Sequence, residues 1–244
     1  TVSLTVAPIE YKNQKINLID TPGLFDFEEG MAEGMRAAGT ALINISGKSG
    51  VNVGTEKAFD AAGERGIARF FFVNKLDSDH ADFYKVLTQL KAEFGPAVCP
   101  QDHKVQCYID VLEYKAFRYE NGKPKPVPLP DMGERLDGLR TAIYEAVAET
   151  SEEAFEKYFS GEAFTPEELI VGLSSGVRSG SVYPVYCGAT QTMDAIDMLL
   201  KGLMWMAPTA AQKHAEVTAD GEEIQVSKDG DTAAVVFRTV YDPF

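Results

Sequence analysis

Short apolar segments that end in polar motifs recur along the first 104 residues, and they constrain the fold more than any other feature. Lys15–Asp20 and Thr40–Ser46 are two such segments, and Arg69–Asn74 (RFFFVN) is the most apolar of them. Runs of this length are typical of strands buried on both faces of a parallel sheet. Helical patterns separate them, so the sequence predicts an α/β fold with a mostly parallel sheet and helices on both faces.

The remaining elements of this region follow from the same patterns. Val2–Tyr11 is a further predicted strand, and Asn13-Gln14 is the expected turn before Lys15. Two helices are predicted, at Thr55–Glu64 with Thr55 as N-cap and at Asp79–Phe94 with Gly95-Pro96 ending it.

The character of the sequence changes after residue 104, which indicates an inserted α+β subdomain at 105–182. Its predicted elements are edge strands or a hairpin at Val105–Tyr119, a proline-rich loop, and helices at about Glu134–Phe159 and Thr165–Gly176. A strand at Ser181–Gly188 and a helix at Gln191–Met206 then return to the first domain. The core is therefore predicted to comprise residues 1–104 and 183–207, and one more strand is predicted at Thr232–Val240.

Composition excludes several classes of protein. The net charge of −14 argues against general binding of nucleic acid, because an acidic surface repels phosphate groups. Three scattered cysteines form no CxxC pair, which argues against a zinc site or a disulfide framework and favours a reducing compartment. There is no apolar run of membrane-spanning length and no signal-peptide pattern, so we expect a cytoplasmic protein without a membrane partner.

The motif Asp20-Thr21-Pro22-Gly23 follows a predicted strand. Ligands bind at the carboxyl ends of strands in open parallel sheets, and a carboxylate there suits Mg²⁺. Gly23 would let its backbone N–H approach a phosphate closely. The DxxG pattern alone is weak, because a chain of this length contains about one by chance, and a simple turn explains it equally well.

The motif Asn74-Lys75-Leu76-Asp77 also follows a strand and is much more specific. A carboxylate at Asp77 can accept two hydrogen bonds from the N1–H and N2–H₂ groups of guanine, a pair of donors that adenine lacks. The Lys75 stem can cover the face of a purine, and Asn74 can join neighbouring loops. A third loop, Gly188-Ala189-Thr190, ends the last strand, and its small residues would leave backbone N–H groups free for the guanine O6.

The sequence contains no complete GxxxxGK[ST] phosphate loop. Gly47-Lys48-Ser49 has the correct ending, but Leu42 stands where the first glycine is required. Such a loop supplies most of the phosphate binding in nucleotide sites, so we expect the isolated chain to be a fragment that binds little nucleotide.

From about Thr1 to its end, the chain resembles elongation factor G, and in particular the bacterial paralogues of that family. The segments INLIDTPG, FFVNKLD, PVYCGA and VFRTVYDPF carry the resemblance and occur in family order. The resemblance implies a P-loop-GTPase-like fold whose inserted subdomain is residues 105–182. It also implies that residues 208–244 form a linker and the first strand of a following β-barrel.

The resemblance also implies the roles of individual residues. Asp20 and Gly23 would contact Mg²⁺ and the γ-phosphate, and Thr1 stands where the family keeps its Mg²⁺-binding threonine. Asn74, Lys75 and Asp77 would bind guanine, together with the loop of Gly188, Ala189 and Thr190. The implied cofactor is GTP or GDP with Mg²⁺, the implied partner is the ribosome, and the implied activity is GTP hydrolysis during elongation.

One residue departs from the family pattern. The residue after DTPG is normally a histidine that positions the attacking water, whereas here it is Leu24. Leucine cannot hydrogen-bond to water, which predicts slow GTP hydrolysis unless Phe25, Asp26 or a ribosomal element compensates. The sequence therefore leaves other functions open: a tetracycline-resistance-type ribosome-protection GTPase, a non-hydrolysing nucleotide- or ribosome-binding module, or a structural fragment independent of nucleotide.

Overall fold

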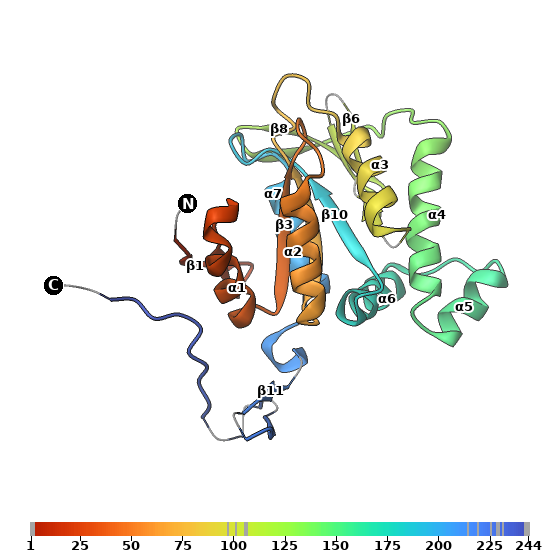
Figure 1. Ribbon diagram of the computed structural model, residues 1–244. Coiled ribbons are helices and arrows are strands. Elements are labelled where there is room, and N and C mark those ends of the chain that lie inside the picture. Colours follow the sequence, from red (N-terminus) through yellow and green to blue (C-terminus); the bar gives the residue numbers. More distant parts are fainter. Residues whose placement is uncertain are drawn as a thin grey trace.

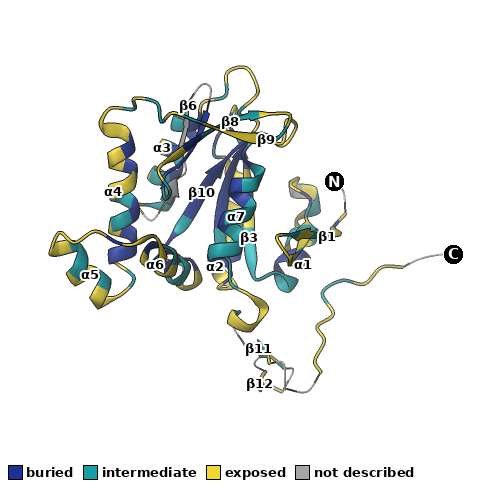
Figure 2. Cartoon of the chain, turned by 180° about the vertical axis from the view of Figure 1, so that it is seen from behind, coloured by how far each residue is buried: buried dark blue, intermediate teal, exposed yellow. Residues whose placement is uncertain are grey.

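A four-stranded parallel sheet forms the centre of the fold (Figure 1). The computed structural model describes residues 3–96, 98–100, 102–104, 107–213, 215–218, 220–224, 226–227, 230 and 232–241. In sheet order the strands are β3 (Thr40–Ser46), β4 (Ala68–Asn74), β10 (Tyr183–Cys187) and β5 (Val98–Pro100). Helix α2 (Val53–Glu64) covers one face and α7 (Ile196–Met206) the opposite face (Figures 1 and 2). The predicted α/β fold is confirmed.

Strand β4 is the most buried element of the sheet. Phe70, Phe71, Phe72 and Val73 are all buried, although successive side chains point to opposite faces of a strand. Phe71 stacks on Phe59 of α2 with a centroid distance of 5.8 Å. Burying a side chain of this size contributes about 1.5–3 kcal/mol, so this strand fixes the position of the loop that follows it.

The first two strands lie outside the mostly parallel sheet. Strands β1 (Thr5–Tyr11) and β2 (Gln14–Asp20) form a separate antiparallel pair. Their turn lies at Lys12-Asn13, one residue earlier than expected, and both residues have positive φ, 47° and 63°. A two-residue turn of this kind can join only antiparallel strands, since a parallel connection needs a crossover of about a dozen residues.

Two predicted helices begin at different residues, because the capping residue was misassigned. Asn52, not Thr55, caps α2. The Asn52 side chain accepts from the Thr55 N–H at 3.1 Å, and the Asn52 N–H donates to the Thr55 hydroxyl oxygen. Asp82 caps α3 (Phe83–Phe94), which therefore starts four residues later than predicted. Asparagine and aspartate are strong caps because a short side-chain oxygen satisfies an unpaired backbone N–H.

A helix that the sequence patterns did not predict follows β2. After a short 3₁₀ turn, η1 (Phe25–Phe27), helix α1 (Glu28–Ala37) packs against the hairpin (Figure 1). Gly30 and Gly34 lower its intrinsic propensity but allow close approach: a Cβ on Gly30 would lie 2.9 Å from Pro22. The helix therefore depends on tertiary packing, which sequence periodicity does not show.

The inserted region has the predicted α+β composition. An antiparallel sheet is formed by β6 (Asp102–Lys104), β7 (Cys107–Asp110), β8 (Lys115–Glu120) and β9 (Lys123–Val127). Helices α4 (Glu134–Ala148), α5 (Glu152–Phe159) and α6 (Pro166–Ser179) follow. The single helix predicted for 134–159 is thus two helices, because Ser151 caps a new one. One hydrophobic cluster joins this region to the main sheet, and the boundaries 105–182 stay a prediction.

The C-terminal segment has little regular structure in its described residues. Beyond α7 lie the 3₁₀ turn η2 (Ala210–Gln212) and a short pair of strands, β11 (Glu216–Val217) and β12 (Glu223–Ile224). Within the described residues, positions 232–241 form no strand, so the prediction of a strand at Thr232–Val240 is wrong. Arg238 of this segment donates to the Leu4 carbonyl and faces Glu33 of α1.

Close packing of α4 against α6 gives a stability prediction. A Cβ on Gly172 would lie 2.6 Å from the buried Val147, whereas a Cβ on Gly138, also within a helix, would meet nothing within 4 Å. We expect Gly172→Ala to lower the free energy of unfolding by about 1–3 kcal/mol through overpacking. Gly138→Ala should raise it by roughly 0.5–1 kcal/mol. Urea denaturation followed by circular dichroism checks both, and equal effects would contradict the close approach.

Candidate functional site

Three strands of the main sheet end at the same edge. Ser46 at the end of β3 is in register with Asn74 at the end of β4, and Cys187 at the end of β10 is in register with Val73. The three strands are parallel, so the loops that follow them leave from one end of the sheet. This is the end at which ligands bind in open α/β folds.

The side chain of Asn74 joins two of these loops. Its Oδ1 accepts from the backbone N–H groups of Lys75 at 2.7 Å and of Thr190 at 3.0 Å, and its Nδ2 donates to Thr190 Oγ1 at 3.1 Å. The Leu76 N–H donates to the Gly188 carbonyl at 3.2 Å, which adds a backbone link. Asn74 is buried, so the loss of these bonds would leave polar groups unsatisfied. The sequence prediction that Asn74 ties neighbouring loops together agrees with this geometry.

Lys75 and Asp77 have a different environment from Asn74. Both side chains are exposed, and Lys75 has a left-handed backbone with φ 62°. A non-glycine residue in this region is uncommon and is maintained by surrounding contacts, here the bonds around Asn74. The motif thus places one buried residue that fixes the loop beside two exposed residues that are available to a ligand.

The loop after β3 supports this arrangement from the other side. The Gly47 N–H donates to the Asn74 carbonyl at 2.7 Å, and the Gly47 carbonyl accepts from the Asp82 N–H at 3.0 Å. A Cβ on Gly47 would lie 2.7 Å from a methyl group of Leu76. The Gly47-Lys48-Ser49 sequence is therefore a supporting turn. Sequence reasoning missed this role, although the glycine directly after a buried strand was a usable signal.

The expectation of free backbone N–H groups in the third loop is wrong. The Gly188 N–H donates to the Val73 carbonyl at 2.9 Å, the Ala189 N–H to the Asp194 carbonyl at 3.1 Å, and the Thr190 N–H to Asn74. A Cβ on Gly188 would lie 2.5 Å from the Asp194 carbonyl, so the loop closes tightly on itself. Small residues serve this closure, and a ligand atom would have to share one of these donors.

Acidic groups and a tyrosine surround the two loops. Burial raises the pKa of Asp194, and the nearby negative charge of Asp77 raises this pKa further, against a hydrogen bond from Thr192. Burial also raises the pKa of Tyr108, with contributions from Cys187, Asp194 and Asp77. Tyr108 is buried in the same hydrophobic cluster as Cys187 at the end of β10, and Asp194 pairs with Ala189 of the third loop. No sequence pattern had indicated either residue, because they come from separate elements.

The DTPG motif lies apart from these loops. Asp20 ends β2 in the separate hairpin, Pro22 is buried beneath α1, and a Cβ on Gly23 would meet nothing within 4 Å. Leu24 is 64% exposed. An ion pair of 2.5 Å between Glu28 at the start of α1 and Lys57 of α2 connects this region to the helix that follows β3. Thr1 lies outside the described residues.

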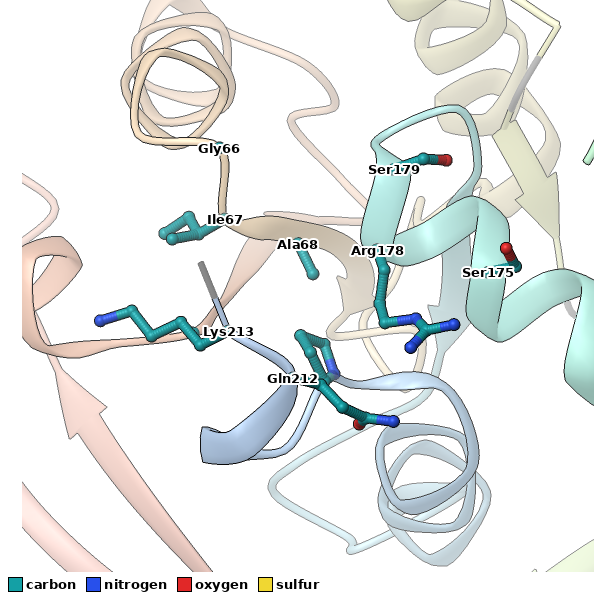
Figure 3. A pocket seen from close by; sticks show the side chains of 10 residues that line it. Gly66, Ile67, Ala68, Ser175, Arg178, Ser179, Gln212 and Lys213 are labelled. Atoms are coloured by element: carbon teal, nitrogen blue, oxygen red, sulfur yellow. The ribbon is translucent and has the colours of Figure 1, made fainter. Parts of the chain in front are cut away.

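A cavity of about 330 Å³ occurs elsewhere, at the amino ends of the strands. Gly39 and Ala68 line it together with Arg178 and Ser179 of α6, and with Gln212 (Figure 3). This is the end of the sheet opposite to the loops of Asn74 and Thr190. Among the described residues, no group of three or more His, Cys, Asp or Glu side chains could hold a metal ion.

Comparison with known proteins assigns the chain. The profile of the elongation factor Tu GTP-binding domain matches residues 1–209. The chain belongs to this family. An elongation factor G-like protein of Thermotoga maritima is 31% identical in sequence to this chain. The alignment covers 98% of this chain and 36% of the relative. A crystal structure of a Thermus thermophilus protein superposes with a TM-score of 0.80 and 33% identity, covering 87% of this chain and 33% of the other.

These similarities identify a translational GTPase domain related to elongation factor G, a family for which GTP binding is implied. The chain spans about a third of the length of both relatives. In the part of this GTPase domain that the structure describes, no helix is both long and apolar enough to cross a bilayer.

The bonds around Asn74 can be tested without any ligand. We expect Asn74→Ala to lower the free energy of unfolding by about 1–3 kcal/mol, since two N–H groups lose their acceptor, and to accelerate hydrogen exchange at the Thr190 amide. Thr190→Val removes only a hydroxyl acceptor and should cost less, roughly 0.5–1.5 kcal/mol. Urea titration and amide exchange measured by NMR provide both readouts. Unchanged exchange at Thr190 in Asn74→Ala would contradict the assigned bond.

Proposed function

We propose that the two loops joined by Asn74 form the guanine site of this domain. The observation that carries the proposal is the placement of exposed Lys75 and Asp77 beside the loop of Gly188 to Thr190, with buried Asn74 between them. The Asp77 carboxylate would accept from N1–H and N2–H₂ of guanine, and the Lys75 stem would cover the base. The guanine O6 would take a shared hydrogen bond from the Thr190 N–H.

The phosphate and metal roles belong to the hairpin side of the molecule. Mg²⁺ is usually held by one or two carboxylates together with phosphate oxygens and water. The single carboxylate of Asp20 fits this kind of donor set. Gly23, with open space around its Cα, would let its N–H approach the γ-phosphate. Thr1 would be a second ligand of the ion.

For the whole protein we propose a GTPase that acts on the ribosome in the cytoplasm during elongation, in translocation. The similarity to an elongation factor G-like protein supports this role. A ribosome-protection GTPase of the tetracycline-resistance type is the second candidate of the same class. The exposed Leu24 specifically favours a third candidate, a non-hydrolysing nucleotide- or ribosome-binding module, because an apolar side chain beside DTPG cannot orient water.

Base recognition gives the sharpest test of the guanine site. In Asp77→Asn, the amide oxygen can still accept from the N1–H of guanine, but the amide NH₂ then faces the N2–H₂ group, and two donors repel. Xanthine has a carbonyl oxygen in place of N2–H₂, which can accept from the amide NH₂. We expect the affinity for GDP to fall roughly a hundredfold and the affinity for xanthosine diphosphate to rise. Titration of fluorescent nucleotides against the protein at its full natural length measures both.

The control for this test is Asp79→Asn, which makes the same change of charge on an exposed residue of the same loop. We expect it to leave both affinities within about twofold, because Asp79 lies outside the NKLD motif and exposed charges interact weakly. An equal loss of GDP binding in both variants would show that charge, and not recognition by Asp77, determines the affinity.

Leu24 gives a second test, of hydrolysis. With an imidazole available to orient water, we expect Leu24→His to raise the ribosome-stimulated single-turnover rate of GTP hydrolysis at least about tenfold over the unmodified protein. Leu24→Met is the matched control, since it keeps an apolar side chain of similar size. Equally fast hydrolysis by all three proteins would contradict slow hydrolysis and would indicate that another group positions the water.

A further inference from the structure

The inserted sheet contacts the segment that closes the third loop. The turn between β8 and β9 places Gly122, with φ 71°, so that a Cβ on it would lie 2.9 Å from the Met193 Cβ and 3.5 Å from the Thr192 carbonyl. Met193 and Ala195 have positive φ of 63° and 60°. Two non-glycine residues in left-handed conformations so close together are maintained only by surrounding contacts. The turn of the inserted sheet is one of those contacts.

A hydrogen bond fixes the far end of the same segment. Tyr119 of β8 donates its hydroxyl to Asp197 Oδ1 at 2.5 Å, in the first turn of α7. Burial raises the pKa of Tyr119, and the bond to Asp197 raises this pKa further, so the hydroxyl keeps its proton at neutral pH and acts as donor. Bonds between a hydroxyl and a carboxylate are stronger than neutral ones. The start of α7 is therefore attached to the inserted sheet.

A second tyrosine extends this contact to the candidate base-binding loops. Tyr108 of β7 packs edge-on against Tyr119 with a centroid distance of 5.5 Å, and it is buried. Tyr108 belongs to the same buried cluster as Cys187, at the end of β10, and Ala195, and its pKa is raised by burial together with Cys187, Asp194 and Asp77. The tyrosine pair thus lies between the inserted sheet and the two loops that Asn74 joins.

We propose that Tyr119 is a positioning residue for nucleotide retention: through Asp197 and the β8–β9 turn, the inserted sheet holds residues 189–195 in the conformation that accepts guanine. The inference rests on the proposed guanine site. Displacement of residues 189–195 would strain the Ala189–Asp194 backbone pair and the bonds of Thr190 to Asn74, which also orient the loop of Asp77. The inserted sheet therefore sets the rate at which guanine nucleotide leaves.

The test compares two tyrosines of the inserted region that make the same kind of bond. Tyr119→Phe removes the bond to Asp197, and Tyr114→Phe removes a bond of 2.9 Å from an exposed hydroxyl to Asp137, away from the loops. Stopped-flow measurement with N-methylanthraniloyl-GDP, on the protein at full natural length, gives the association and dissociation rates. We expect Tyr119→Phe to raise the dissociation rate about five- to tenfold with little change in association, and Tyr114→Phe to stay within about twofold.

Two further variants separate positioning from general destabilisation. Asp197→Asn keeps an acceptor for Tyr119 and should stay within about twofold of the unmodified dissociation rate, whereas Asp197→Ala should behave like Tyr119→Phe. Gly122→Ala, whose Cβ would press on Met193, should also accelerate release and provides a second route if Tyr119→Phe folds poorly. Thermal unfolding of each variant checks that the fold is intact.

The outcomes separate this inference from the function on which it rests. The positioning role alone would be overturned if the Tyr119→Phe and Tyr114→Phe proteins released GDP at equal rates while the guanine site passed its own test. That test is passed if the unmodified protein binds GDP and Asp77→Asn shifts the preference toward xanthosine diphosphate. Failure of the unmodified protein to bind GDP in preference to ADP would overturn both. Faster release in Tyr119→Phe, Asp197→Ala and Gly122→Ala but not in Asp197→Asn supports the positioning role.

Discussion

The buried amide of Asn74 is the interaction on which the carboxyl end of the sheet depends. Its oxygen accepts two backbone N–H groups and its nitrogen donates to a hydroxyl, so it links the ends of β4 and β10. A buried amide left without these partners would cost free energy comparable to several lost hydrogen bonds. The two loops therefore move as one unit. The left-handed backbone of Lys75 persists because this unit is rigid.

The electrostatic character of this end suits a ligand that donates hydrogen bonds. Burial raises the pKa values of Asp194 and Tyr108, and the negative charge of the exposed Asp77 raises both pKa values further. Such a group of acceptors attracts the N–H edge of a base and repels phosphate. The chain's acidic balance is thus compatible with nucleotide binding when the base and the phosphates are held at different places, the base at the main sheet and the phosphates beside the hairpin.

The hairpin side is attached through a smaller apolar cluster, in which the buried Met35 of α1 lies with Ala62 of α2 and Ile67, and through partly exposed polar contacts. The ion pair of Glu28 with Lys57 has both side chains about half exposed, and exposed pairs of this kind contribute about 0–1 kcal/mol. The Tyr11 hydroxyl reaches the Asp197 carbonyl at 3.5 Å, a long hydrogen bond. Arg238 binds the Leu4 carbonyl from the C-terminal segment. The two ends differ because the loops after β4 and β10 follow strands of the large hydrophobic cluster, whereas α1 packs on the small one.

Much of the fold and part of the site followed from the sequence, because local patterns determine them. The buried run before Asn74 determined a central strand, and the spacing of NKLD after it predicted where an exposed carboxylate would lie. The strands β3, β4 and β10 and the inserted α+β region were predicted by periodicity and by breaks in it. Capping residues were less certain, since Asn52 and Thr55 are both good caps and only the geometry distinguishes them.

Other features depend on contacts between residues distant in sequence, which no local pattern contains. The hairpin's separation from the main sheet, the glycine-rich helix α1 and the split of the helix at Ser151 are decided by packing. The same holds for the third loop, where small residues predicted free N–H groups but the carbonyls of Val73 and Asp194 and the side chain of Asn74 accept from all three. The sequence by itself determined which residues are proposed to recognise a purine. Tertiary structure alone decided which of their hydrogen bonds remain available, because a donor is free only if no other part of the folded chain reaches it.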